Sequence, residues 1–493
     1  MRIGVDLGTT RTVVAYVDRG NYPLVSFADA DGDQHDFVPS LVALDQGRLV
    51  YGWAARAAAA TGAPSLRSFK RLLASPDVSP QTRVRVGDHE TGLLDLVTGH
   101  LVALRAEVAA VLEDDHLEAV AGVPAHAHTA QRFITLEAFR RAGFSVLGMV
   151  NEPSAASFEY THRQPKTVTS RRNQIVVYDL GGGTFDASLV EVEDTRHQVV
   201  SSVGLNHLGG DDFDEALAGV AQQVSGATRL SEAEYEKLLD EAREAKERLT
   251  PQARRVSVEV AGRPVTVPVD QFYEAAAELV GRSTEAMAPL LSGNGDQEDT
   301  SSLAGIYIVG GASALPLVSR SLRERFGRRV HRSPYPGSST AIGLAIAADP
   351  TAGYSLTERL SRGFGVFREL DAGARLGFDQ LLDRDQVTST TGSVVVTRRY
   401  LAAHNVGHFL FVEYDHLVEG SPAGTVTPFV EVLFPYDRSL RDAPDLGEVE
   451  VCRTPDGPEV EERYEIDLHG MVTVTITSLA DGYHQTYALT STE

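Results

Sequence analysis

The chain carries the same acidic, glycine-containing turn twice, and this duplication limits its possible folds more than any other feature. The first copy is DLGTT, from Asp6 to Thr10, and the second is DLGGGTFD, from Asp179 to Asp186. A short apolar run precedes each aspartate and a second strand-like segment follows, so both copies are predicted to be β-hairpins. In a dinucleotide-binding fingerprint or a P-loop, the glycines would open a helix instead. The pattern therefore predicts two related halves, each with a hairpin turn.

The composition of these turns suits a ligand that carries phosphate groups. Consecutive glycines leave backbone N–H groups uncovered, which creates a concavity suited to phosphate oxygens. Thr9, Thr10 and Thr184 add hydroxyl donors. A glycine-rich hairpin alone is more often just a tight bend, but two halves with such turns can close over opposite sides of one polyphosphate. Two glycine pairs, Gly209-Gly210 and Gly310-Gly311, lie beside further apolar or helix-like segments.

Eight motifs in order make the chain resemble the Hsp70 chaperones, within the superfamily of actin, sugar kinase and Hsp70 ATPases. Besides IGVDLGTT and DLGGGTFD they are HLGGDDFD, IVGGASALP, SFKRLL (68–73), GVPAHAHTAQR (122–132), VNEPSAA (150–156) and AKERLT (245–250). One such motif would be a modest signal, whereas this ordered set spans nearly the whole chain. The resemblance implies an α/β fold: a two-lobed, actin-like (ribonuclease H-like) ATPase domain followed by a β-sandwich domain.

Changes in pattern along the 493 residues predict where these domains begin and end. Residues 1–348 alternate strand and helix signals, and Ser231 to Leu249 reads as a charged helix opened by a serine N-cap. Residues 349–360 are predicted to be an interdomain linker. Residues 361–493 contain strand-like segments separated by turns such as His469-Gly470, as expected of the β-sandwich. Because the last strand-like segment lies near the end of the chain, we expect no helical lid.

Charge and cysteine content exclude several functional classes. The formal net charge of -23 disfavours nucleic acid and anionic membranes as partners. Cys452 is the one cysteine, so neither an internal disulfide nor a cysteine zinc cluster is available. The sequence shows no apolar signal segment and no membrane-spanning run. We therefore expect a cytoplasmic protein.

The resemblance assigns the two aspartates that open the turns to a metal site. A nucleoside triphosphate needs Mg²⁺ to neutralise part of its charge, and Mg²⁺ prefers oxygen ligands and retains several waters. Asp6 and Asp179, one from each hairpin, are the predicted metal residues, and ATP or ADP with Mg²⁺ is the predicted cofactor. The alternative is that each acid merely caps a turn.

The resemblance also assigns the catalytic residues, which are Lys70, Glu152, Asp179 and Thr184. Lys70 corresponds to the lysine that reaches the γ-phosphate, where a cation stabilises charge that develops as the phosphoryl group departs. Glu152 corresponds to the glutamate that orders the attacking water, and Pro153 restricts the backbone before it. Apart from the resemblance, Lys70 would be read as a solvated surface lysine and Glu152 as a helix cap.

The remaining nucleotide contacts are predicted with three departures from the family pattern. Arg243 stands where an acid is expected to contact adenosine, Ala314 replaces an arginine beside the base, and Gly337 replaces an aspartate. Phosphate chemistry is therefore expected to be intact and base recognition altered. The predicted nucleotide-binding residues are Gly8, Thr9, Thr10, Gly181, Gly182, Gly183, Thr184, Gly209, Gly210, Lys246, Thr250, Gly310 and Gly311.

Coupling between the domains is implied by Pro124 and Arg132, which match the residues that relay the nucleotide state in the family. The linker departs from the pattern, because only Leu356 and Leu360 are available as docking leucines. The expected function is an ATP-hydrolysing chaperone whose β domain binds extended peptides or a dedicated partner, with a possible J-domain co-chaperone. Two alternatives stay open: a nucleotide-binding scaffold with vestigial hydrolysis, and a sugar kinase or actin-like filament protein.

Overall fold

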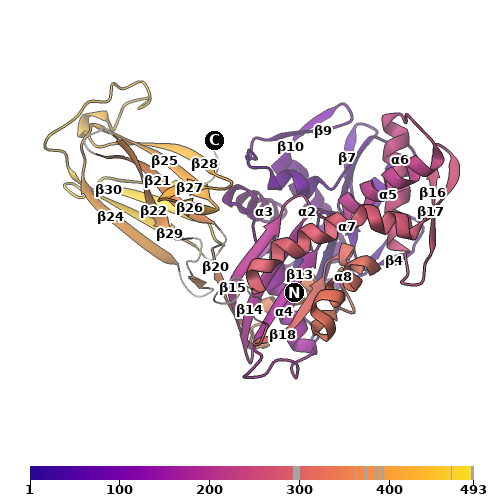
Figure 1. The fold of residues 1–493 in the computed structure, drawn as a ribbon. Coiled ribbons are helices and arrows are strands. Elements are labelled where there is room, and N and C mark those ends of the chain that lie inside the picture. The colour runs from indigo at the N-terminus through magenta and orange to yellow at the C-terminus, as the bar shows by residue number, and fades with distance from the viewer. Residues whose placement is uncertain are drawn as a thin grey trace.

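A computed structural model describes residues 1–291, 300–360, 362–370, 375–383, 387–389, 393–467 and 469–489. An α/β part and an all-β part lie side by side, with helix α3 (Thr129–Arg141) near their junction (Figure 1). In the described part of the chain, no helix has the length and apolar character needed to cross a lipid bilayer.

The first predicted turn belongs to a five-stranded sheet, here called sheet A, with the order β12-β11-β1-β2-β5. Strands β1 and β2 are antiparallel, with Val5 opposite Val14, so the predicted hairpin is confirmed. Strand β11 runs parallel to β1, which is typical of an α/β sheet. The strands of sheet A are β1 (Arg2–Leu7), β2 (Arg11–Tyr16), β5 (Val38–Pro39), β11 (Glu118–Val123) and β12 (Ser145–Asn151).

The second turn belongs to a seven-stranded sheet, sheet B, with the order β19-β18-β13-β14-β15-β20-β23. Strands β13 and β14 are antiparallel and place Asp179 opposite Asp186, which confirms the second hairpin. The strands of sheet B are β13 (Gln174–Leu180), β14 (Phe185–Glu193), β15 (Arg196–Leu205), β18 (Leu303–Val309), β19 (Val330–Arg332), β20 (Ser355–Arg359) and β23 (Val387–Ser389).

Two helices join the sheets. Helix α9 (Ser339–Ala348) packs on sheet A, helix α4 (Glu152–Arg163) packs on sheet B, and the two helices pack on each other. Their apolar residues share one buried cluster with strands of both sheets. The other long helices are α1 (Gly52–Ala60), α2 (Leu93–Leu112), α5 (Gly210–Ser225), α6 (Glu232–Glu247), α7 (Val269–Met287) and α8 (Pro316–Phe326).

Helix α6 confirms the predicted charged helix. The Ser231 side chain accepts a hydrogen bond from the backbone N–H of Glu234, and the Glu234 carboxylate accepts from the backbone of Ser231. This capping box satisfies backbone donors that a helix N-terminus otherwise leaves unpaired. The helix ends at Glu247, two residues before the predicted end.

The all-β part contains two four-stranded sheets that share a core of aromatic and branched side chains, and a two-stranded sheet of β26 (His416–Val418) and β27 (Ser421–Ala423). His469 and Gly470 lie in the turn between β29 and β30, as predicted, and Gly470 has a φ of 74° that favours glycine. One sheet contains β22 (Arg375–Leu382), β21 (Gly363–Leu370), β25 (Val406–Tyr414) and β28 (Thr427–Pro435). The other contains β24 (Val394–Leu401), β29 (Glu459–Ile466), β30 (Val472–Ser478) and β31 (His484–Ala488).

Residues 355–359 of the segment predicted to be a linker form strand β20 of sheet B. Strand β20 runs parallel to β15. Strand β23, which comes after β21 and β22 in the chain, pairs antiparallel with β20. Leu356 is only 5% exposed, whereas Leu360 is partly buried against the core of the all-β part. The proposed domain boundaries and the absence of a helical lid remain predictions.

Candidate nucleotide-binding site

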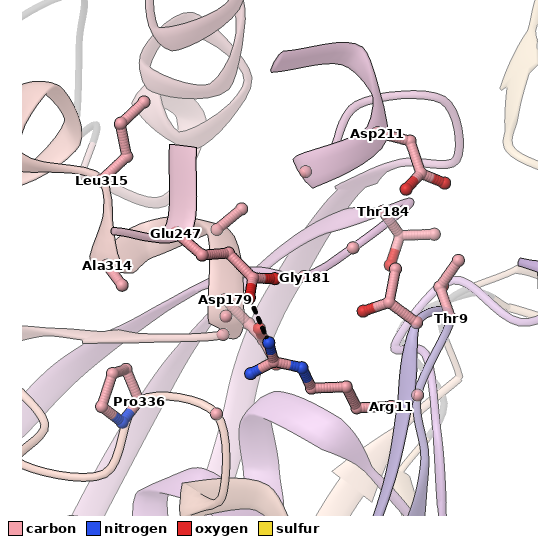
Figure 2. A pocket seen from close by; sticks show the side chains of 18 of the residues that line it. Thr9, Arg11, Asp179, Gly181, Thr184, Asp211, Glu247, Ala314, Leu315 and Pro336 are labelled. Atoms are coloured by element: carbon pink, nitrogen blue, oxygen red, sulfur yellow. Dashed lines mark hydrogen bonds and ion pairs between the residues drawn. The ribbon is translucent and has the colours of Figure 1, made fainter. Parts of the chain in front are cut away.

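A cavity of about 260 Å³ lies between the two hairpin turns (Figure 2). Asp6 and Asp179 both line it, so the two turns face a common space as predicted. The other predicted site residues that line the cavity are Gly8, Thr9, Thr10, Lys70, Glu152, Gly181, Gly182, Thr184, Gly210, Lys246, Gly310 and Gly311.

Close contact between the turns explains their glycines. A Cβ atom added to Gly182 would lie 2.6 Å from the Cγ2 atom of Thr10, and one added to Gly183 would lie 2.8 Å from the Cγ2 atom of Thr9. A Cβ at Gly209 would meet the backbone nitrogen of Gly183 at 2.5 Å. Gly183 and Gly209 therefore serve the packing of the turns and do not line the cavity.

Two of the four catalytic residues predicted from the resemblance, Lys70 and Glu152, meet at a buried part of the site. Lys70 lies in a short 3₁₀ helix (Phe69–Ala74), and Glu152 opens helix α4. The Lys70 ammonium donates a hydrogen bond of 2.6 Å to the Glu152 carboxylate. Lys70 is 7% exposed and Glu152 is 8% exposed, so the alternative reading of Lys70 as a solvated surface residue is wrong.

Crowded carboxylates give this region an unbalanced negative charge. Burial, and then the charge of Glu152, raises the pKa of Asp6 to about 7 despite the opposing effect of Lys70. Burial and the neighbouring acids raise the pKa of Asp179 well above its ordinary value. Burial disfavours the charged form of Lys70, but Glu152 and Asp6 together raise its pKa. Both aspartates therefore hold a proton more tightly than an exposed acid does, and a cation placed beside them would favour their charged forms.

At the opposite end of the cavity, the lining side chains are smaller and less polar. Ala312, Ala314, Leu315 and Pro336 line it, together with Gly337 and Thr340. Gly310 adopts a φ of 85°, and a Cβ there would lie 2.3 Å from the Leu180 carbonyl oxygen. Gly310 thus allows this wall to approach the hairpin of sheet B directly.

Arg243 and Lys246 form a network of ion pairs that the sequence did not predict. Arg243 forms ion pairs with Asp211 at 2.8 Å and with Asp214 at 3.2 Å. The Lys246 ammonium contacts Asp214 at 2.6 Å and donates to the Gly210 carbonyl oxygen. These acids come from α5 and the two cations from α6, so the departure at Arg243 is matched by acids on the neighbouring helix.

Two further residues at the cavity were also missed. Arg11 lies at the start of β2, and its guanidinium pairs at 2.5 Å with the carboxylate of Glu247 at the end of α6 (Figure 2). Both residues line the cavity. Only the charge of Arg11, directly after the DLGTT turn, was available as a signal. Thr250, in contrast, is exposed and does not line the cavity, although its neighbour Leu249 does.

The two predicted coupling residues lie away from the cavity. Pro124 is buried after β11, and Arg132 lies in the first turns of α3. The Arg132 guanidinium donates a hydrogen bond of 2.6 Å to the Asn151 side chain, next to Glu152. Burial lowers the pKa of Arg132, while the charges of Glu358 and Glu413 oppose that change. Arg132 therefore lies among residues of sheet A, β20 and the all-β part.

Comparisons with known proteins agree with this arrangement. The family model described as "Hsp70 protein" matches residues 2–360. The chain is 36% identical over 372 residues to the chaperone protein HscA of Enterobacter sp. (strain 638), covering 72% of this chain and 58% of that protein. It is 34% identical over 369 residues to the HscA of Citrobacter koseri, covering 71% and 58%. The chain thus spans less than two thirds of the length of these relatives.

The family match covers well over half of the chain, and it includes both hairpin turns and the cavity between them. The chain belongs to the Hsp70 family.

Proposed function

We propose that the protein is an Hsp70-like molecular chaperone that binds and slowly hydrolyses ATP. In this proposal, sheets A and B are the cores of the two lobes of an actin-like ATPase domain, and the cavity between them holds the nucleotide. The observation that carries the proposal is the buried Lys70–Glu152 ion pair, which lies in one cavity with a hairpin turn from each sheet.

The two residues of this ion pair have complementary roles in phosphoryl transfer. The Lys70 ammonium stabilises negative charge on the transferred phosphoryl group. The Glu152 carboxylate orients the attacking water and accepts a hydrogen bond from it. Backbone N–H groups of the turns and the hydroxyls of Thr9, Thr10 and Thr184 bind the phosphates.

The acids in the cavity fit a bound Mg²⁺ ion. Asp6 and Asp179 offer carboxylate oxygens, and burial, followed by the charges of neighbouring acids, raises the pKa of both groups. A bound cation would favour their charged forms. Across the described residues, no three His, Cys, Asp or Glu side chains are grouped to hold a metal directly. We therefore propose that Asp6 and Asp179 hold Mg²⁺ mainly through water and nucleotide oxygens, as this ion commonly binds. The metal would neutralise phosphate charge.

We further propose that the all-β part binds an extended peptide or a dedicated protein partner in the cytoplasm. An extended peptide gains affinity from strand-like backbone hydrogen bonds. A J-domain co-chaperone is the partner proposed to stimulate hydrolysis. In this scheme, hydrolysis shifts the population between two arrangements of the chain that differ in affinity for the peptide.

Single-turnover hydrolysis tests the enzymatic role. The Lys70→Ala variant is expected to hydrolyse bound ATP about a hundredfold more slowly than the wild type, because the cation beside the phosphoryl group is lost. Glu152→Gln is expected to slow the reaction by about tenfold or more. Lys237→Ala is the matched control, because Lys237 pairs with Glu259 and does not line the cavity.

Calorimetric titration with ATP shows whether each variant still binds nucleotide and is folded. Equal hydrolysis rates for the wild type and Lys70→Ala would contradict the enzymatic proposal. A protein that binds ATP but shows this result would be a nucleotide-binding scaffold. Binding affinities alone would not distinguish a scaffold from an ATPase.

A further inference from the structure

Arg11 and Glu247 bridge the mouth of the cavity from opposite sides. Arg11 follows the phosphate turn of sheet A, whereas Glu247 is the last residue of α6. They are 236 residues apart in the sequence, and their side chains remain 39% and 45% exposed. The guanidinium carbon of Arg11 also lies 4.4 Å from the centre of the Phe37 ring, which supports the extended arginine side chain.

This ion pair lies between the two chemically different ends of the cavity. In Figure 2, Thr9 and Thr184 of the phosphate turns lie on one side of the pair. Ala314, Leu315 and Pro336 of the less polar end lie on the other side. A nucleotide has the same order of parts, because its ribose connects the phosphates to the base. The ribose of a bound nucleotide would therefore lie beside Arg11 and Glu247.

We propose that Glu247 recognises the ribose hydroxyls of the nucleotide and that Arg11 holds the Glu247 carboxylate in place. This inference rests on the proposed nucleotide-binding function and names residues of that site that determine specificity.

The chemistry of both side chains suits this role. An ionised carboxylate only accepts hydrogen bonds and has two oxygens, so it can accept from both the 2′- and the 3′-hydroxyl. Guanidinium has five donors, so Arg11 can keep its contact with Glu247 and still donate to another oxygen of the ligand. Acidic residues bind ribose hydroxyls in the same way in dinucleotide-binding folds.

The exposure of the pair allows Glu247 to exchange or share its partner. Ion pairs between solvent-exposed side chains contribute only about 0 to 1 kcal/mol. The Glu247 carboxylate can therefore accept hydrogen bonds from a ribose, and keep or partly exchange its contact with Arg11, without a large loss of free energy. Because Arg11 and Glu247 come from opposite sides of the cavity, the bound ribose would be held by both.

The role is tested by comparing ATP with 2′,3′-dideoxy-ATP in calorimetric titrations of the full chain. The wild type is expected to bind ATP about tenfold or more tightly than the dideoxy analogue, the range of a hydrogen bond to a charged group. Glu247→Gln should reduce this ratio to about threefold or less, while its affinity for the analogue changes little. Arg11→Ala should reduce the ratio in the same direction.

Glu244→Gln is the matched control. Glu244 lies on the same helix and pairs with Arg56 at 3.5 Å, but it does not line the cavity. Its substitution should leave the ratio at the wild-type value, and thermal unfolding should show that all variants are folded.

The outcomes separate this inference from the function on which it rests. If the wild type binds neither ATP nor ADP, the proposed function fails. If it binds ATP and Glu247→Gln keeps the full preference over the analogue, the ribose role is overturned. If Glu247→Gln weakens both ligands equally, the pair only ties the two sides of the cavity together, and the ribose role is again overturned.

Discussion

Two glycines set how closely the elements that join the sheets approach each other. A Cβ at Gly343 of α9 would lie 1.8 Å from the carbonyl oxygen of Ala155 in α4, and one at Gly4 of β1 would lie 2.2 Å from the backbone nitrogen of Ala345. Helix α9 therefore packs directly on the backbone of α4 and β1. The relative position of the two turns depends on this contact, because α4 packs on sheet B and α9 on sheet A.

Gly343→Ala is expected to destabilise the protein by about 2 kcal/mol or more, because the added methyl group overlaps a backbone atom that has no space to move. Gly219→Ala is the control: Gly219 is an exposed helical residue of α5 with no atom within 4 Å of its Cβ position. This second change should stabilise the protein by about 0.5 to 1 kcal/mol. Denaturant unfolding measures both, and equal effects would show that the close approach has no energetic role.

Helix α6 presents a stripe of acids to arginines of the part built around sheet A. Besides the Arg11–Glu247 pair, Arg67 contacts Asp240 at 2.6 Å and Glu236 at 3.5 Å, and Arg56 contacts Glu244 at 3.5 Å. The acids are spaced at about one helical turn, so they lie on one face. Each exposed pair contributes little alone. Together these ion pairs hold α6 to the part built around sheet A.

Arg67→Ala is expected to increase the dissociation rate of ADP by about two- to fivefold, because Arg67 makes two of these contacts. Raising the salt concentration should also accelerate release from the wild type, since screening weakens exposed ion pairs. Stopped-flow release of a fluorescent ADP analogue measures both effects. Lys237→Ala removes an exposed pair that does not cross the cavity, and its release rate should match the wild type. A salt-independent rate would exclude an electrostatic contribution of α6.

The all-β part is joined to the α/β part by a buried polar contact at the start of α3. The backbone N–H and the hydroxyl of Thr129 donate to the Glu413 carboxylate at 3.2 and 3.1 Å. Arg362 pairs with Glu413 at 3.6 Å and with Asp415 at 3.1 Å. Burial raises the pKa of Glu413, and the charge of Arg362 opposes that change. Met471, from the turn after β29, is 8% exposed and joins the apolar core around sheet A.

Glu413→Ala is expected to loosen this junction, because it leaves Thr129 without its acceptor and removes one partner of Arg362. Limited proteolysis should then cleave the 349–360 segment several-fold faster than in the wild type. Glu431→Gln is the control, since Glu431 is exposed on β28 and pairs with His408 within the all-β part. Equal cleavage rates for Glu413→Ala and the wild type would show that this contact does not hold the two parts together.

Several features of the fold and the site were predictable because their signals are local. Both hairpins follow from an apolar run, an acid and a glycine turn within about fifteen residues. Ser231, with acids just after it, predicted the start of α6 as an N-cap. Lys70 and Glu152 required the family resemblance, because their own neighbours in the chain do not distinguish a catalytic residue from a surface lysine or a helix cap.

The sequence by itself determined the two acidic, glycine-containing hairpin turns, the positions of their acids and the change to strand-rich patterns after residue 360. Only the tertiary structure decided that Arg243 pairs with acids of α5, that β20 joins sheet B, and that Arg11 meets Glu247. The physical reason is that hydrogen bonding and side-chain periodicity act between near neighbours in the chain. An ion pair between residues 236 positions apart depends instead on where the tertiary structure places β2 and helix α6 relative to each other.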